Sequence, residues 1–118
     1  MKLTCRHYSG ATLFTVAGQV DIRTSAELEE FIGRQRRRFD DHVIVDMREL
    51  TFIDSSGLAV LLAAGALARA HGAGLHLAGV QPMPARLLEI TGADRAVTFH
   101  DDVEQALTAV LAAGHARP

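Results

Sequence analysis

Leu50-Thr51-Phe52-Ile53-Asp54-Ser55-Ser56-Gly57-Leu58 is the stretch of this sequence that decides the fold. The apolar residues 42–47 before it predict a buried strand. Residues 58–70 after it are rich in Ala and Leu, contain no Pro, and predict a helix. Residues 54–57 therefore lie where a loop enters a helix. Asp and Ser cap helices through their side-chain oxygens, and Gly lets the backbone turn or pass close to a neighbour.

The simplest interpretation of Asp54-Ser55-Ser56-Gly57 is a helix cap. One cap needs one side chain, however, and here three residues of the capping type stand in a row. The redundancy predicts that at least one hydroxyl is spare and exposed. It would lie at the positive end of a helix, where an anion such as a phosphoryl group is tolerated.

Composition excludes several classes of protein. The chain has 118 residues, 48% of them hydrophobic and 22% charged, which fits one soluble globular domain with a real core. The net charge of −2 gives no support for nucleic-acid binding. The single Cys5 suits a reducing compartment, the N-terminus lacks the apolar core of a signal peptide, and residues 58–68 are too short to span a bilayer. We therefore expect a cytoplasmic protein that does not insert into a membrane.

The rest of the chain alternates strands with helices. Residues 3–8 and 12–17 predict a β-hairpin, and residues 18–21 are expected to leave its second strand. Thr24 or Ser25 is expected to cap the first helix, and further strand–helix pairs follow at residues 75–91 and 96–113. The order ββαβαβαβα predicts an α/β single domain over residues 1–113, with a mixed sheet of four to five strands and about four helices. Residues 114–118 are expected to form a flexible tail.

Motifs for catalysis, metals and cofactors are missing. The sequence has no Gly-x-Gly-x-x-Gly, no P-loop, and no Gly-x-Ser-x-Gly around Ser55 or Ser56. The six histidines are scattered, the one Cys cannot anchor a zinc site, and the only Lys is Lys2. We therefore expect no enzyme activity, no metal and no cofactor. Asp21, Asp46 and Asp54 fall at strand exits and could meet at one sheet edge, with capping and turn roles as the simpler alternative.

Three blocks of the sequence resemble the STAS family, and within it the bacterial anti-sigma factor antagonists. The middle block, residues 44–58, is similar to the family's central strand and phosphoacceptor loop. Gly18-Gln19-Val20-Asp21, with Thr24 and Ser25 downstream, resembles the turn before its first helix, and residues 91–107 resemble its last strand and helix. Two positions depart from the family pattern: Gln19 replaces the usual acid, and Ala59 replaces a second Gly.

The resemblance implies a switch protein that is not an enzyme. Such proteins bind an anti-sigma factor that is also a serine kinase with the histidine-kinase-type ATPase fold, and this frees the sigma factor. It also implies that the kinase phosphorylates the Ser directly after the Asp, here Ser55, and that a serine phosphatase reverses the reaction. Asp54, Ser56 and Gly57 would then form the phosphoacceptor loop and helix cap, and Asp21, Thr24 and Leu58 would contact the partner.

Two other functions remain open. A STAS subunit without a phospho-switch, for example in a lipid-transport ATPase complex, would share the fold, although a hydroxyl directly after Asp54 argues against it. A small hydrolase using Ser55 or Ser56 would need a general base, and no motif places one.

Overall fold

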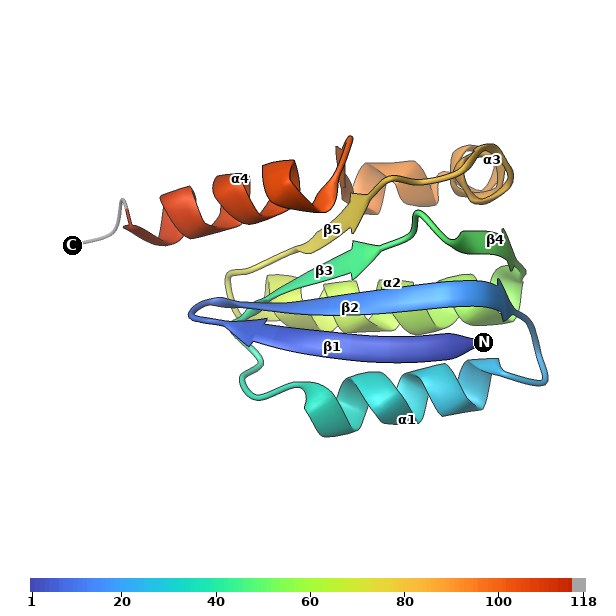
Figure 1. Cartoon of the computed structure of the whole chain (residues 1–118), viewed down its shortest axis with the longest axis horizontal. Coiled ribbons are helices and arrows are strands. Elements are labelled where there is room, and N and C mark those ends of the chain that lie inside the picture. The colour runs from blue at the N-terminus through green and yellow to red at the C-terminus, as the bar shows by residue number, and fades with distance from the viewer. Residues whose placement is uncertain (116–118) are drawn as a thin grey trace.

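The computed structural model describes residues 1–115, and within them six strands and four α-helices form an α/β fold (Figure 1). The elements are, in chain order, β1 Lys2–Tyr8, β2 Ala11–Val20, α1 Ser25–Gln35, β3 His42–Asp46, β4 Leu50–Ile53, α2 Ser55–Ala70, β5 Leu75–Ala78, α3 Pro82–Thr91, a 3₁₀ turn at Ala93–Ala96, β6 Thr98–His100 and α4 Val103–His115. No helix in these residues is long and apolar enough to cross a membrane.

The sheet is mixed, as predicted, and its main path runs β1-β2-β3-β5-β6. β1 and β2 pair antiparallel, and the other pairs are parallel. β2 has ten residues and serves two partners. Its first half pairs with β3, and its last three residues pair with β4, with a register shift between Gly18 and Gln19 within this pairing.

Two predictions about this region are wrong: the number of strands in the sheet and the residue at which β2 ends. The sheet has six strands within residues 1–115 rather than four or five, because Leu50–Ile53 forms β4 instead of a loop. Residues 18–20 do not leave β2; they continue it and pair with β4, where the register shift skips Thr51. The element order is therefore ββαββαβαβα. Near the other end, Gly114 and His115, which were predicted to start the tail, belong to α4, and residues 116–118 lie outside the described residues.

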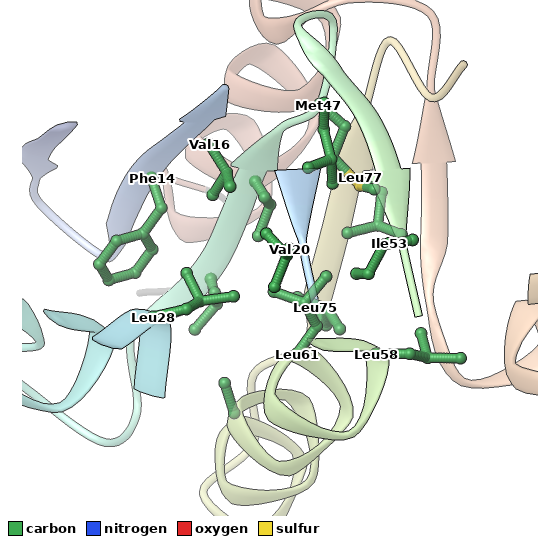
Figure 2. Packing of buried hydrophobic residues seen from close by; sticks show 14 of the residues in the cluster. Phe14, Val16, Val20, Leu28, Met47, Ile53, Leu58, Leu61, Leu75 and Leu77 are labelled. Atoms are coloured by element: carbon green, nitrogen blue, oxygen red, sulfur yellow. The ribbon is translucent and has the colours of Figure 1, made fainter. Parts of the chain in front are cut away.

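Side-chain alternation along β3 divides the core into two layers. Val43 and Val45 join the larger cluster, which α1 and α2 cover, and Ile44 joins the smaller one beneath α4. Figure 2 shows the larger cluster gathered between the sheet and α2. The labelled side chains are Phe14, Val16, Val20, Leu28, Met47, Ile53, Leu58, Leu61, Leu75 and Leu77. The larger cluster fixes the position of α2, and with it the residues that begin this helix.

Candidate functional site

Asp54 caps α2 through its side chain, as the sequence predicts for a residue of this type. Its Oδ1 accepts hydrogen bonds from the backbone N–H groups of Ser56, at 2.9 Å, and Gly57, at 3.2 Å. The Ser56 hydroxyl donates to the same oxygen at 2.5 Å. The main-chain oxygen of Asp54 accepts from the N–H of Leu58 at 3.0 Å. The side chain of Asp54 therefore satisfies two of the N–H groups at the start of the helix that have no partner within it, and its main-chain oxygen accepts the first regular helical hydrogen bond.

Asp54 also joins the loop between β2 and α1 to the start of α2. Its Oδ2 accepts from the N–H of Ile22 at 3.1 Å, and its own N–H donates to the oxygen of Val20 at 3.1 Å. The hydrogen bond from the Ser56 hydroxyl, together with those from the N–H groups of Gly57, Ser56 and Ile22, lowers the pKa of Asp54. The carboxylate is thus held ionised, and both of its oxygens are occupied.

The two serines that follow differ sharply. Ser56 is half-buried, and its hydroxyl is bound to Asp54, so Ser56 supports the cap rather than forming it. Ser55 is exposed at the first position of α2, and its hydroxyl has no hydrogen-bond partner among residues 1–115. The spare hydroxyl expected from the sequence is therefore that of Ser55.

Gly57 allows α2 to approach the sheet closely, as expected for a Gly at this position. A Cβ atom here would lie 2.6 Å from a Val20 methyl carbon and 2.9 Å from Ile53 Cγ1. Both distances are too short for carbon atoms in contact. Gly57 therefore sets how deeply the first turn of α2, with Ser55 on it, lies against β2 and β4.

Asp21 and Thr24 form a turn beside this cap. The side chain of Asp21 accepts from the N–H and the guanidinium of Arg23, and these contacts lower the pKa of Asp21. Thr24 Oγ1 accepts from the N–H of Asp21 at 3.0 Å. Thr24 is the residue before α1 but makes no side-chain cap hydrogen bond, so the predicted cap by Thr24 is replaced by this turn. The turn presents Ile22, whose N–H is bound to Asp54.

Two residues named from the sequence lie elsewhere. Leu58, expected at the partner surface, is only 5% exposed and packs in the larger core cluster, so it supports the helix and does not face a partner. Asp46 is buried at the end of β3 and pairs with Arg48, whose guanidinium donates to Asp46 Oδ2 at 2.9 Å. This is the turn role given as the simpler alternative for Asp46.

Two apolar residues that the sequence pattern does not single out lie close to the cap in the chain. The side chain of Ile22 is 78% exposed and that of Phe52 39% exposed. Ile22 stands alone between Asp21 and Arg23, and this isolation was the one available signal. Phe52 is exposed in β4, whereas the next residue, Ile53, is buried. Single exposed apolar side chains are common on protein surfaces, and these two are notable because Ile22 adjoins Asp21 and Phe52 is two residues before Asp54.

The surroundings of Ser55 bear on what its hydroxyl could do chemically. Among residues 1–115 no side chain accepts its proton, so no general base activates it. No group of three or more His, Cys, Asp or Glu side chains in the described part of the chain could hold a metal ion.

Comparison with known proteins agrees with this architecture. The model of the STAS domain family matches residues 2–106. The anti-sigma F factor antagonist of Paenibacillus polymyxa is 29% identical over 112 residues, which cover 92% of this chain and 93% of that protein. The structure of the anti-sigma factor antagonist SpoIIAA in its unphosphorylated form is 16% identical, with a TM-score of 0.78 over 94% of this chain and 97% of that one.

The Bacillus cell fate determinant SpoIIAA in its phosphorylated form has a TM-score of 0.72 at 17% identity, over 92% of this chain and 99% of that one. At such identities these two likenesses show the fold, which is a mixed sheet with four helices. Because the family model spans most of the sequence, the chain belongs to the STAS domain family.

Proposed function

We propose that this protein is an anti-sigma factor antagonist controlled by phosphorylation of Ser55. The unphosphorylated form binds a serine-kinase anti-sigma factor of the histidine-kinase-type ATPase fold and releases its sigma factor in the bacterial cytoplasm. The kinase then phosphorylates Ser55, which ends binding, and a serine phosphatase restores the hydroxyl. The name of the Paenibacillus polymyxa relative supports the class of function.

One observation carries the proposal: the hydroxyl of Ser55 is exposed and unpartnered, while the hydroxyl of the neighbouring Ser56 is bound to Asp54. A kinase must reach the oxygen that attacks the phosphoryl group. Ser55 offers this oxygen without breaking a contact, whereas Ser56 would have to abandon the carboxylate first. The choice between the two serines therefore favours Ser55.

The surroundings support a strong effect of the added charge. A phosphoryl group carries about −1.5 to −2 charges at pH 7. The N–H groups of Ser56 and Gly57 already donate to the side chain of Asp54, so they cannot neutralise a phosphate on Ser55 without releasing the cap. The new charge would also lie next to the ionised Asp54. It would therefore face outward, toward a bound partner, and leave the fold unchanged.

The partner surface proposed here is the turn at Asp21 and Thr24, the α2 start at Ser55, and the exposed side chains of Ile22 and Phe52. Ile22 is joined to Asp54 through its N–H, so a protein that covers Ile22 also covers the neighbourhood of Ser55. Burial of Ile22 and Phe52 against the partner would provide affinity, and phosphorylation of the Ser55 hydroxyl would control binding. A subunit of a lipid-transport ATPase complex without a phospho-switch remains the second candidate, because the family fold alone does not separate the two.

The test uses the cognate kinase, sought among genes next to this one. Ser55→Ala should abolish phosphorylation and keep binding, and Ser55→Asp should fold normally but bind at least about tenfold more weakly by titration calorimetry, since a like-charge clash at an interface costs several kcal/mol. Ser56→Ala is the matched control and should still be phosphorylated. Phosphate mapped to Ser56 alone would move the site by one residue.

If the wild type and Ser55→Asp bind the kinase with equal affinity, the proposal that charge at Ser55 controls binding is wrong. Co-purification with transporter subunits and no kinase would favour the second candidate. Esterase activity that is lost in Ser55→Ala would overturn the assignment as a protein without enzyme activity.

A further inference from the structure

Three of the six histidines, scattered in the sequence, lie in a row across three parallel strands. His42 begins β3, His76 lies in β5 and His100 ends β6. His42 Nδ1 is 3.1 Å from His76 Nε2, and His76 Nδ1 is 3.0 Å from His100 Nε2. All three residues are half-buried. We call these three residues the histidine ladder.

The contacts in the histidine ladder are N–H···N hydrogen bonds rather than face-to-face stacking. The ring centres are 5.1 and 5.2 Å apart, while the facing nitrogens are about 2 Å closer, so the nitrogens lie between the rings. Facing nitrogens at such distances fit an ordinary hydrogen bond. Each imidazole thus joins its strand to the next, in addition to the backbone pairing.

A backbone group fixes the direction of these bonds. The N–H of Gly74 donates to His42 Nδ1 at 3.1 Å, so this nitrogen carries no proton. His76 must therefore donate to it from a protonated Nε2. A neutral His76 then has a bare Nδ1, which accepts from a protonated Nε2 of His100. One tautomer of each ring is compatible with all three hydrogen bonds, with the lone pair of His42 Nδ1 shared by the N–H groups of Gly74 and His76.

We propose that the histidine ladder is an acid-sensitive clamp that holds β6 and α4 against the sheet. β6 has only three residues and, within residues 1–115, pairs with β5 alone. α4 follows directly and packs over the smaller core cluster, where Ala106 and Val110 are its buried side chains. Val103 and Leu107 of α4 are partly buried against the same cluster, and the bonds through His76 add a polar link from β5 to β6 to this packing.

Protons act unequally on the three rings. A proton added to His100 leaves both bonds intact, because its Nε2 already donates. A proton added to Nδ1 of His76 would place two N–H groups against each other, and one on Nδ1 of His42 would displace the N–H groups of both Gly74 and His76. The clamp therefore fails when His42 or His76 becomes charged.

The pKa of His76 sets where this happens. Burial, and then the charges of His42 and His100, lower the pKa of His76 from 6.5 to about 4. In the open state the ring would regain a pKa near 6.5, so the open state binds a proton that the closed state refuses. The free energy that favours the closed state therefore decreases as pH falls from about 6.5 to about 4. Below that range, His76 causes no further decrease.

Two aspartates lie close to the ladder in the sequence: Asp41 is next to His42, and Asp102 is two residues after His100. Asp41 is buried beside His42, and burial is the main cause that raises the pKa of its carboxyl group. When Asp41 is ionised, its negative charge favours a proton on His42. Asp102 caps α4 by accepting from the N–H of Gln105 at 2.8 Å. Asp46 of β3 is paired with Arg48, and Asp101 and Glu104 follow β6 in the chain.

The test is amide hydrogen exchange by NMR between pH 7 and 4.5, corrected for the intrinsic exchange rate. In the wild type, protection of residues 98–100 and of α4 should fall up to about tenfold per pH unit below about pH 6, and about 100-fold at most. His76→Gln and His76→Phe remove the titrating ring, so their protection should be independent of pH. His71→Gln is the matched control, since His71 is exposed and contacts Leu67 instead of the ladder.

If protection depends on pH equally in the wild type and in the His76 variants, the proposal is wrong. It is also wrong if α1 and α2 lose as much protection at low pH as β6 and α4. If neither variant folds, ¹⁵N NMR of the wild-type rings decides the question. His76 should carry its proton on Nε2 at pH 7 and titrate below about pH 5. A proton on Nδ1, or a ring that titrates near its ordinary value, would refute the proposal.

Discussion

The hydrogen-bond networks at Asp54 and at the histidine ladder both join separate elements, but they have central groups of opposite character. Asp54 is a charged acceptor surrounded by N–H and O–H donors from the β2–α1 loop and the start of α2. His76 is a neutral ring that must donate on one side and accept on the other. Acid disturbs both, but His76 is affected at a higher pH than Asp54, whose pKa is lowered. The start of α2 should therefore remain intact at a pH where β6 and α4 begin to open.

The largest expected effect comes from forcing α2 away from the sheet beside Asp54. Gly57→Ala places a methyl group within 3 Å of Val20 and Ile53, and both are buried. Overpacking of this kind costs about 1–3 kcal/mol, so we expect the free energy of unfolding to fall by about that amount in urea titrations. Gly33→Ala in α1 is the matched control. Its methyl group would meet open space, and the better helix propensity of Ala should stabilise the protein by up to about 1 kcal/mol. If Gly57→Ala leaves the free energy of unfolding unchanged, α2 does not approach Val20 and Ile53 as closely as described.

A smaller effect is expected from removing the carboxylate itself. Asp54→Ala loses the cap and the bond from the N–H of Ile22, and we expect the melting temperature to fall by about 5 °C in thermal denaturation followed by circular dichroism. Asp21→Ala is the control, because Asp21 pairs mainly with Arg23, whose side chain is exposed, and such pairs contribute little. If the two variants lose equal stability, Asp54 is not the centre of the network.

The pH dependence of Asp54 sharpens the contrast with His76. Because hydrogen bonds lower the pKa of Asp54 in the folded state, its stabilising contribution is present above pH about 4 and is lost as pH falls through the lowered value. Asp54→Asn keeps an oxygen for the cap but has no charge. Its melting temperature should lie below that of the wild type at pH 6 and approach it near pH 2. A gap that does not change with pH would show that the charge contributes nothing. The histidine ladder is present in both proteins, so its effect cancels.

The two networks also show what sequence reasoning could and could not find. The cap was predicted because its residues are adjacent, and propensity and capping act over a few positions. The residues of the histidine ladder are 34 and 24 positions apart, and only the register of β3, β5 and β6 brings them together. β4 was missed for a related reason: its four residues pair with the distant end of β2 and show no periodicity long enough to stand out. Leu58 was misplaced because an apolar residue after a surface motif fits either a partner surface or a core, and only the packing decides.

The smallest expected effect is at Ser55. The hydroxyl of Ser55 is exposed and has no partner among residues 1–115, so Ser55→Ala should change the free energy of unfolding by less than about 0.5 kcal/mol. Ser56→Ala deletes the same atoms one position later but removes the hydrogen bond to Asp54, and should cost about 1 kcal/mol. Urea titration of the two variants beside the wild type measures both. If Ser55→Ala were the more destabilising of the two, the hydroxyl of Ser55 would be engaged in the fold and would not be free for a kinase.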